Sequence, residues 1–552
     1  MIFLIFMKFI KVFLNSFLCG LFFSSLLALL IYNLNINLNF ELRFFLQLML
    51  FTYITYGILL SVACMFFFFI VQFFQGKKMN PALISPPFLS LGFSLLSLLF
   101  LFIFRANQNY FQSFFEPETK SLMTSQSTFI ILLVILGPFF FYLLRRARRK
   151  IIISLLFYLL FGAGIFFSIY LRYSFPLPSR HQKLSYLKAK EIEKRVILIE
   201  LEGLSFDFII PLVNKGKLPN FSWFMERGSW GRLKNFTPSD PFILNASFET
   251  AKLPAKHRQI SSVRYRLLNF KSEIEVTPRF ILFNLLTRTG LVKIKTSNPI
   301  SKSKDIWSIL SENKATYLKN DSLFPQVPEE PNPRVEKAFK TFYEDLLEEK
   351  DPLLNILRNS FSSDCEQEDL IFKRKIQEQP QLTYFHLHGL NLVEKFFYKY
   401  SFPELFGNVD QEKINRYGSV ISRYYEFYDQ IIGKYLAALR ENELLVIFST
   451  HGIEPLPLWK RVIEWFFGNP EVSGYHEYAP DGVIFFYGKE IVEGNHIEKI
   501  DLIDLVPTLL NYLSLPVGRD MDGVVISSIF NDEFKTENPV LYISSYEEIV
   551  IR

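Results

Sequence analysis

Cysteine is scarce in this chain of 552 residues, which has only three. Cys19 and Cys64 lie in strongly apolar stretches, and Cys365 stands alone in the polar part of the sequence. No disulfide can therefore form within the polar part. An oxidising compartment is neither required nor excluded.

Charged residues are sparse before Tyr173, but after Ser179 they are as dense as in a soluble protein. This shift predicts two regions of different kind, as the length also suggests. The net charge of +6 is small for this length, and much of it comes from Arg145–Lys150. The composition therefore excludes a nucleic-acid partner.

Five stretches of the first region are long and apolar enough to cross a bilayer as helices, which takes about 20 residues each. They are Phe9–Ile31, Phe44–Phe74, Ala82–Phe104, Phe129–Leu144 and Ile151–Leu171. The fourth is the shortest and contains Pro138. A signal peptide is the alternative for the first, but its apolar run exceeds the roughly 7–15 residues of such a segment. We therefore predict an uncleaved helix.

The distribution of Lys and Arg predicts the orientation, because cytoplasmic loops carry an excess of both. With the N-terminus in the cytoplasm, the inner segments carry nine basic residues: Lys8, Lys11, Lys77, Lys78, Arg145, Arg146, Arg148, Arg149 and Lys150. The outer loops carry three: Arg43, Arg105 and Lys120. This pattern predicts that the C-terminal domain lies outside the cytoplasm. We expect the membrane to be a prokaryotic inner membrane, which would place this domain in the periplasm.

The helices have the composition of an anchor. None of the last four stretches has an ionisable residue in its middle. Such residues usually mark ion or proton pathways, so a transporter is disfavoured.

The second region alternates short β-branched runs with helical patterns. The runs are Val196–Leu201, Thr383–His388, Leu444–Ser449 and Gly482–Tyr487. This alternation predicts an α/β domain with a mostly parallel sheet sandwiched by helices. The predicted organisation is a transmembrane region over 1–175, a linker over 176–195 and an α/β domain over 196–552. A charged, proline-containing insertion or cap is expected at about 264–380.

Polar residues follow the predicted strands, where ligands bind in such sheets. These residues are Glu202, Asn391, Thr450 and His451.

Several motifs occur in the order found in one known family. They are VILIELEGLSFD (Val196–Asp207), GKLPNF (Gly216–Phe221), TAKLPAKH (Thr250–His257), FSTHG (Phe448–Gly452), SGYHEYAPDG (Ser473–Gly482) and DLIDLVPTLL (Asp501–Leu510). Together they resemble the type I phosphodiesterase/nucleotide pyrophosphatase family of the alkaline phosphatase superfamily, to which the sulfatases are related. The resemblance implies an alkaline-phosphatase-like fold, two divalent cations (usually zinc) and a Thr or Ser nucleophile.

Carried over residue by residue, the resemblance implies a damaged site. Glu202 replaces the first aspartate, and the nucleophile position falls on Pro241, which has no hydroxyl; Ser239 could substitute only after a register shift. Three further ligand positions are replaced, and two histidines are retained. The replaced positions are Asn391, Lys395 and Thr450, and the retained ones are His451 and His476. Neither cation keeps the three protein ligands it needs.

Two hypotheses follow from these substitutions. The first is a catalytically degenerate domain that needs no cofactor and binds or scaffolds another membrane protein, or a phosphate-bearing lipid or glycan, next to membrane lipids. The second is a zinc-dependent phosphodiesterase or phosphotransferase with a rebuilt site. Its candidate residues are Glu202, Asp240, His386, His388, His451 and His476. His386 and His388 alternate along one strand and so face the same side, although they could instead be an ordinary hydrogen-bonded pair.

Overall fold

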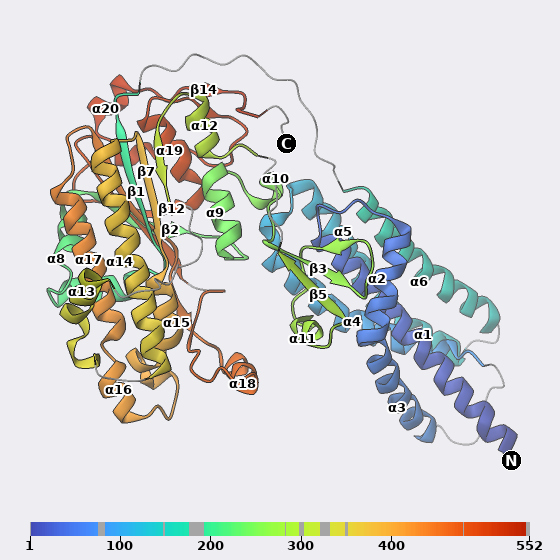
Figure 1. The fold of residues 1–552 in the computed structure, drawn as a ribbon. Helices are drawn as coiled ribbons and strands as arrows, with labels where there is room; N and C mark the ends of the chain where they lie inside the picture. The colour runs from blue at the N-terminus through green and yellow to red at the C-terminus, as the bar shows by residue number, and fades with distance from the viewer. Residues whose placement is uncertain are drawn as a thin grey trace. The chain divides into compact units, whose positions relative to one another are not determined.

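The structure is a computed structural model that describes residues 2–74, 83–146, 150–175, 192–281, 283–296, 303–320, 332–347, 351–477 and 480–547. The chain forms two compact units, which are described separately (Figure 1). The first comprises Met1–Pro178 and Pro254–Ser301, and the second comprises Ser179–Leu253 and Lys302–Arg552. Arg148, Arg149 and most of the predicted linker lie outside the described residues.

The first unit contains five helices that are long and apolar enough to cross a membrane, as the sequence predicted. The second of them is divided by a short π-helical segment, Tyr53–Gly57. The helices are α1 (Ile2–Leu34), α2 (Leu42–Thr52) continued by α3 (Ile58–Phe74), α4 (Pro86–Tyr110), α5 (Pro117–Arg146) and α6 (Lys150–Tyr173).

Helix α5 is much longer than the apolar stretch predicted there and continues through Pro138. One side of its polar N-terminal half is buried, and there Gln126 accepts a hydrogen bond from Asn33 and donates one to the carbonyl of Ser168. Gly137 lies so close to α4 that an added Cβ would sit 2.3 Å from the Cβ of Ser94. Small residues and interhelical hydrogen bonds of this kind hold membrane helices together, and hydropathy alone does not reveal them.

The segment 254–301 belongs to this helical unit. It contains α10 (Pro254–His257), β3 (Val263–Leu267), β4 (Glu273–Ile274), α11 (Phe283–Arg288) and β5 (Val292–Thr296). Asn35, just after α1, accepts hydrogen bonds from the backbone N–H groups of Glu275 and Val276 and donates one to the carbonyl of Val276. Arg258 pairs with Glu116 at 3.1 Å. The region predicted as an insertion, about 264–380, is thus divided between the two units.

The second unit is built on a seven-stranded sheet in the order β12-β2-β11-β8-β1-β7-β6. Only β11 is antiparallel to its neighbours, so the predicted mostly parallel α/β sheet is confirmed. The strands are β1 (Arg195–Leu201), β2 (Ser229–Lys234), β6 (Tyr317–Lys319), β7 (Leu382–Leu387), β8 (Glu443–His451), β11 (Asp481–Tyr487) and β12 (Asn495–Asp501).

Helices cover both faces of this sheet (Figure 1). Ile197 and Ile199 of β1 point into one apolar core, while Val196 and Leu198 point into the other, as the two-residue repeat of a strand requires. The first core includes residues of α7 (Phe206–Asn214), α8 (Pro219–Arg227), α13 (Pro333–Tyr343), α14 (Pro352–Glu378), α15 (Gly389–Ser401), α16 (Gln411–Tyr417) and α17 (Val420–Ala437). The second includes residues of α9 (Pro241–Thr250), α12 (Ile306–Glu312), α19 (Leu505–Tyr512) and α20 (Asp532–Glu537).

Candidate functional site

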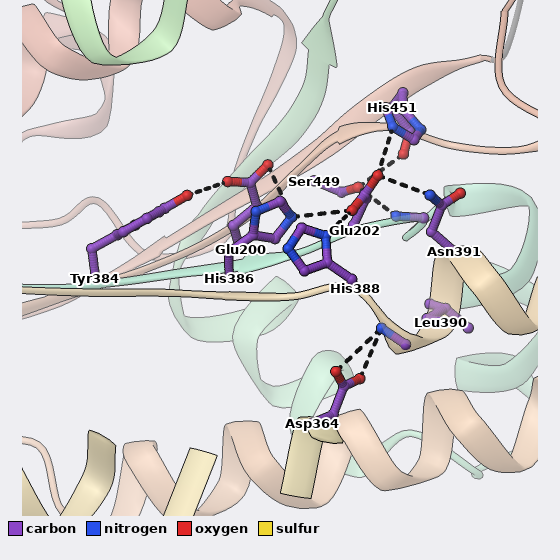
Figure 2. Close-up of polar contacts among 12 residues, drawn as sticks. Glu200, Glu202, Asp364, Tyr384, His386, His388, Leu390, Asn391, Ser449 and His451 are labelled. Carbon is purple, nitrogen blue, oxygen red and sulfur yellow. Dashed lines mark hydrogen bonds and ion pairs between the residues drawn. The ribbon is translucent and has the colours of Figure 1, made fainter. Parts of the chain in front are cut away.

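Polar side chains gather where β1, β7 and β8 end. Strand β1 lies between the other two and parallel to both, so all three carboxyl ends reach the same edge of the sheet. Glu202 follows β1, His388 follows β7, and His451 is the last residue of β8. Figure 2 shows these side chains converging on Glu202.

The Glu202 carboxylate is buried and contacts four side chains. Its Oε2 atom lies 2.5 Å from Nδ1 of His388 and 3.3 Å from Nε2 of His386. Its Oε1 atom lies 3.4 Å from Nε2 of His451 and accepts a hydrogen bond from the Asn391 amide at 2.8 Å. Both carboxylate oxygens are thus in contact with residues of the same chain.

The pleat of β7 brings its polar side chains to this place. Tyr384 and His386 lie on one face of the strand, and His388 continues the same alternation just beyond its end. The Tyr384 hydroxyl donates a 2.7 Å hydrogen bond to Glu200, whose other oxygen lies 3.6 Å from Nε2 of His386. The ring centroids of His386 and His388 are 3.7 Å apart. The two histidines that the sequence places on one side of a strand therefore both reach Glu202.

Burial and ion pairing act in opposite directions on these groups. Burial alone would raise the pKa of Glu202, but the contacts with His386, His388 and His451 outweigh it and hold that pKa well below its usual range. Burial would lower the pKa values of His388 and His451, but the neighbouring Glu202 carboxylate raises both. The cluster therefore favours an ionised carboxylate beside protonated imidazoles.

A second buried carboxylate, Asp364 of α14, orients the start of α15. It accepts hydrogen bonds from the backbone N–H of Gly389 and from the hydroxyls of Tyr424 and Tyr428. Gly389 has no room for a side chain, because an added Cβ would lie 1.9 Å from the Tyr424 hydroxyl. Asp364 thus helps to fix the helix that carries Asn391. Nothing in the sequence marks it, because it lies mid-helix and far from every motif.

The sequence-predicted nucleophile position lies at a helix start. Pro241 is the first residue of α9, and Asp240 caps that helix by accepting a hydrogen bond from the N–H of Phe242. The Ser239 hydroxyl is buried and donates to the backbone carbonyls of His476 and Glu477, each 3.0 Å away. The nearest hydroxyl along the chain is therefore engaged by the backbone.

The remaining predicted site residues are His476, Lys395 and Thr450. The His476 ring stacks on that of His451 with 5.1 Å between centroids. Burial, and then the charge of His451 and the more distant charge of Lys395, lower the pKa of His476 to about 4. Lys395 is exposed on α15 and makes no ion pair with any described residue. Thr450 is buried near the end of β8.

Three residues of this cluster could together hold a cation. The ligand atoms of Glu202, His386 and His388 lie within 4.8 Å of one another. The Nε2 atoms of His386, His388 and His451 are buried without an aligned hydrogen-bond partner. Two imidazoles and a carboxylate are suitable ligands for a zinc-like ion, and His451 lies outside this group. The Asn391 amide donates its hydrogen bond to Glu202.

Comparisons with known proteins agree with the motifs. The family model described as "Type I phosphodiesterase / nucleotide pyrophosphatase" matches residues 196–504, which is more than half of the chain. Among solved structures, the chain is similar to phosphonate monoester hydrolase SpPMH from Silicibacter pomeroyi, with 12% identity and a TM-score of 0.37. That similarity covers 60% of this chain and 76% of the other. No curated protein matches.

We expect Asp364→Asn to change how stability depends on pH. Burial raises the pKa of Asp364 to about 6, so its contribution to stability is present below about pH 4 and is lost as the pH rises through about 6. Two pKa units correspond to about 3 kcal/mol. Between pH 4 and pH 7 the thermal midpoint of the wild-type chain in detergent should therefore fall relative to that of Asp364→Asn. Asp369→Asn, on the outer side of the same helix, is the control. Parallel pH profiles for wild type and Asp364→Asn would contradict this role.

Proposed function

Because the chain belongs to the type I phosphodiesterase/nucleotide pyrophosphatase family, as its motifs predicted, we propose that it is a membrane-anchored member that has lost the family's two-metal hydrolysis. Its α/β unit binds a phosphate-bearing lipid or glycan, or scaffolds another membrane protein. One observation carries the proposal. The carboxylate at the family's first ligand position, Glu202, is enclosed by His386, His388, His451 and Asn391 of its own chain.

The nucleophile supports the same conclusion. Attack on a phosphate ester by the family's route needs a hydroxyl at the position of Pro241, and proline has none. The Ser239 hydroxyl donates to two backbone carbonyls. Reaching the substrate would require breaking these bonds and shifting the start of α9.

A binding role follows from the charges that remain. Lys395 places an ammonium where the family has a metal-binding histidine, and its charge has no acidic partner among the described residues. His388 and His451 compensate the Glu202 carboxylate, so its negative charge opposes an incoming anion less. A phosphate group can therefore be held electrostatically without the metal ions that would activate it.

A second candidate function is favoured by the cluster of Glu202, His386 and His388. These residues would hold one divalent cation, which would supply Lewis-acid chemistry on a phosphoryl oxygen. In that case Glu202 would exchange its histidine contacts for the ion. This candidate is a one-metal hydrolase or phosphotransferase with a rebuilt site.

The location of the α/β unit is also a proposal. Five helices and the excess of Lys and Arg on alternate loops support a cytoplasmic N-terminus and an extracytoplasmic, periplasmic α/β unit. The α/β unit would then be anchored at a bilayer and lie near membrane lipids.

Zinc content and turnover separate the two functions. We expect the full-length chain, loaded with zinc and washed, to retain fewer than two ions and to show no turnover of bis(p-nitrophenyl) phosphate. If one ion is retained, its loss in Glu202→Gln would locate it at Glu202. The control is His496→Ala, which changes an exposed histidine and should keep the ion. Two ions, or turnover abolished by His476→Ala, would refute the degenerate site. One ion together with turnover would support the second candidate.

Lys395 should matter for anion binding. We expect Lys395→Gln to weaken the binding of inorganic phosphate and glycerol 1-phosphate about tenfold, equivalent to about 1.4 kcal/mol, in calorimetric titrations of the full chain. Lys217→Gln removes a lysine that already pairs with Glu426 and should leave binding unchanged. Equal affinities for wild type and Lys395→Gln would rule out this lysine as the phosphate contact.

Reporter fusions test the orientation on the full chain. A fluorescent protein that folds only in the cytoplasm should fluoresce when fused before Met1 and stay dark when fused after Arg552. Fluorescence from both fusions would show that the α/β unit is cytoplasmic.

A further inference from the structure

Helix α18 (Leu458–Phe466) exposes five large apolar side chains and has no buried residue. The exposed fractions are 72% for Leu458, 54% for Trp459, 59% for Val462, 70% for Trp465 and 77% for Phe466. Leu458, Val462, Trp465 and Phe466 follow the spacing of one helix face, and Trp459 lies beside them. Figure 1 shows α18 standing apart from the sheet of the α/β unit.

The polar residues of α18 hold this apolar face outward. Lys460 forms an ion pair with Glu477. The Arg461 guanidinium donates to the backbone carbonyls of Leu456 at 2.6 Å and Leu405 at 2.9 Å. Because Lys460 and Arg461 fix the orientation of the helix, its tryptophans are held in an exposed position. Contiguous exposed apolar patches of this kind mark interaction surfaces.

A pocket of about 400 Å³ adjoins the helix and adds positive charge. Lys399, Lys413 and Arg461 line it together with Asp410 and Glu471, which leaves one positive charge in excess. Both lysines pair with Glu471. Trp465 of α18 is part of the same lining. A basic pocket beside an aromatic, apolar helix face matches the chemistry of a lipid surface, in which anionic headgroups overlie acyl chains.

We propose that α18 lies in the interface of the bilayer that holds the five helices, with its apolar face among the upper acyl chains. Tryptophan prefers this zone, because its ring is apolar and its N–H can bond to headgroups or water. The α/β unit is tethered to the helical unit by three connections, and only three residues separate α9 from α10. This inference does not depend on the proposed phosphate binding.

The position of α18 in the chain connects the bilayer to the site. The helix lies in the segment between His451 and His476, whose rings stack on each other. Its ion pair from Lys460 ends on Glu477, the residue after His476. Docking of α18 would therefore hold this side of the site next to lipid headgroups.

The tryptophans of the chain provide a direct test. There are only five, namely Trp223, Trp230, Trp307, Trp459 and Trp465, and none lies in a membrane-spanning helix. The full chain would be placed in lipid nanodiscs that contain phosphatidylcholine and phosphatidylglycerol, with or without bromine on the acyl chains. Bromine quenches only those indoles that reach the acyl region. We expect lower tryptophan emission in the brominated discs, and a smaller loss when phosphatidylglycerol is omitted.

The double variant Trp459→Gln/Trp465→Gln should abolish this quenching, while Trp223→Gln, which removes a partly exposed tryptophan on α8, should preserve it. An unchanged thermal midpoint would show that the variants are folded. Equal emission from the wild-type chain in both kinds of disc would overturn the proposal. A blue shift of the tryptophan emission that appears only in discs with two copies of the chain would also overturn the proposal. The apolar face of α18 would then be covered by a second copy of the chain.

Discussion

Charge compensation of the buried Glu202 carboxylate is the constraint on which the candidate site depends. Removing a carboxylate from water costs several kcal/mol unless opposite charge and hydrogen bonds replace the lost hydration. Here the replacement comes from the two strands that flank β1: His386 and His388 lie in β7 or just after it, and His451 ends β8. The strand order β7-β1-β8 makes this convergence possible. Asp364 fixes the start of α15, from which the Asn391 amide donates a further hydrogen bond to Glu202.

The substitutions at the family's ligand positions are mutually consistent. A carboxylate at position 391 would repel Glu202 unless a cation lay between them, whereas the Asn391 amide donates to it. At position 395 an ammonium supplies charge that a metal would otherwise bring. In the proposed degenerate site, these changes leave an anion-binding outer side and a neutralised carboxylate at the inner side. The single-cation alternative uses the same residues, because imidazoles that neutralise a carboxylate can also bind a metal with it.

Much of the fold could be predicted from the sequence, because it rests on simple periodicities. The five apolar stretches and the four strands at 196–201, 383–388, 444–449 and 482–487 occur as expected. Hydropathy missed the polar half of α5, because Gln126 is satisfied by side chains and carbonyls of other helices. The motifs located Glu202, Asn391, Lys395 and the retained histidines, but not Asp364 or the contacts of His386 and His388, since these depend on which strands are neighbours. The antiparallel direction of β11 has no local signature either.

The segment 254–301 has a consequence for the architecture as a whole. Because Asn35 and Glu116 bind it to the helical unit, the chain leaves the α/β unit after Leu253 and returns at Lys302. The two units are therefore interleaved in sequence and joined by three covalent connections. No single cut releases the α/β unit intact, and a fragment that begins after α6 would carry a stretch of chain evolved to rest on helices it no longer has.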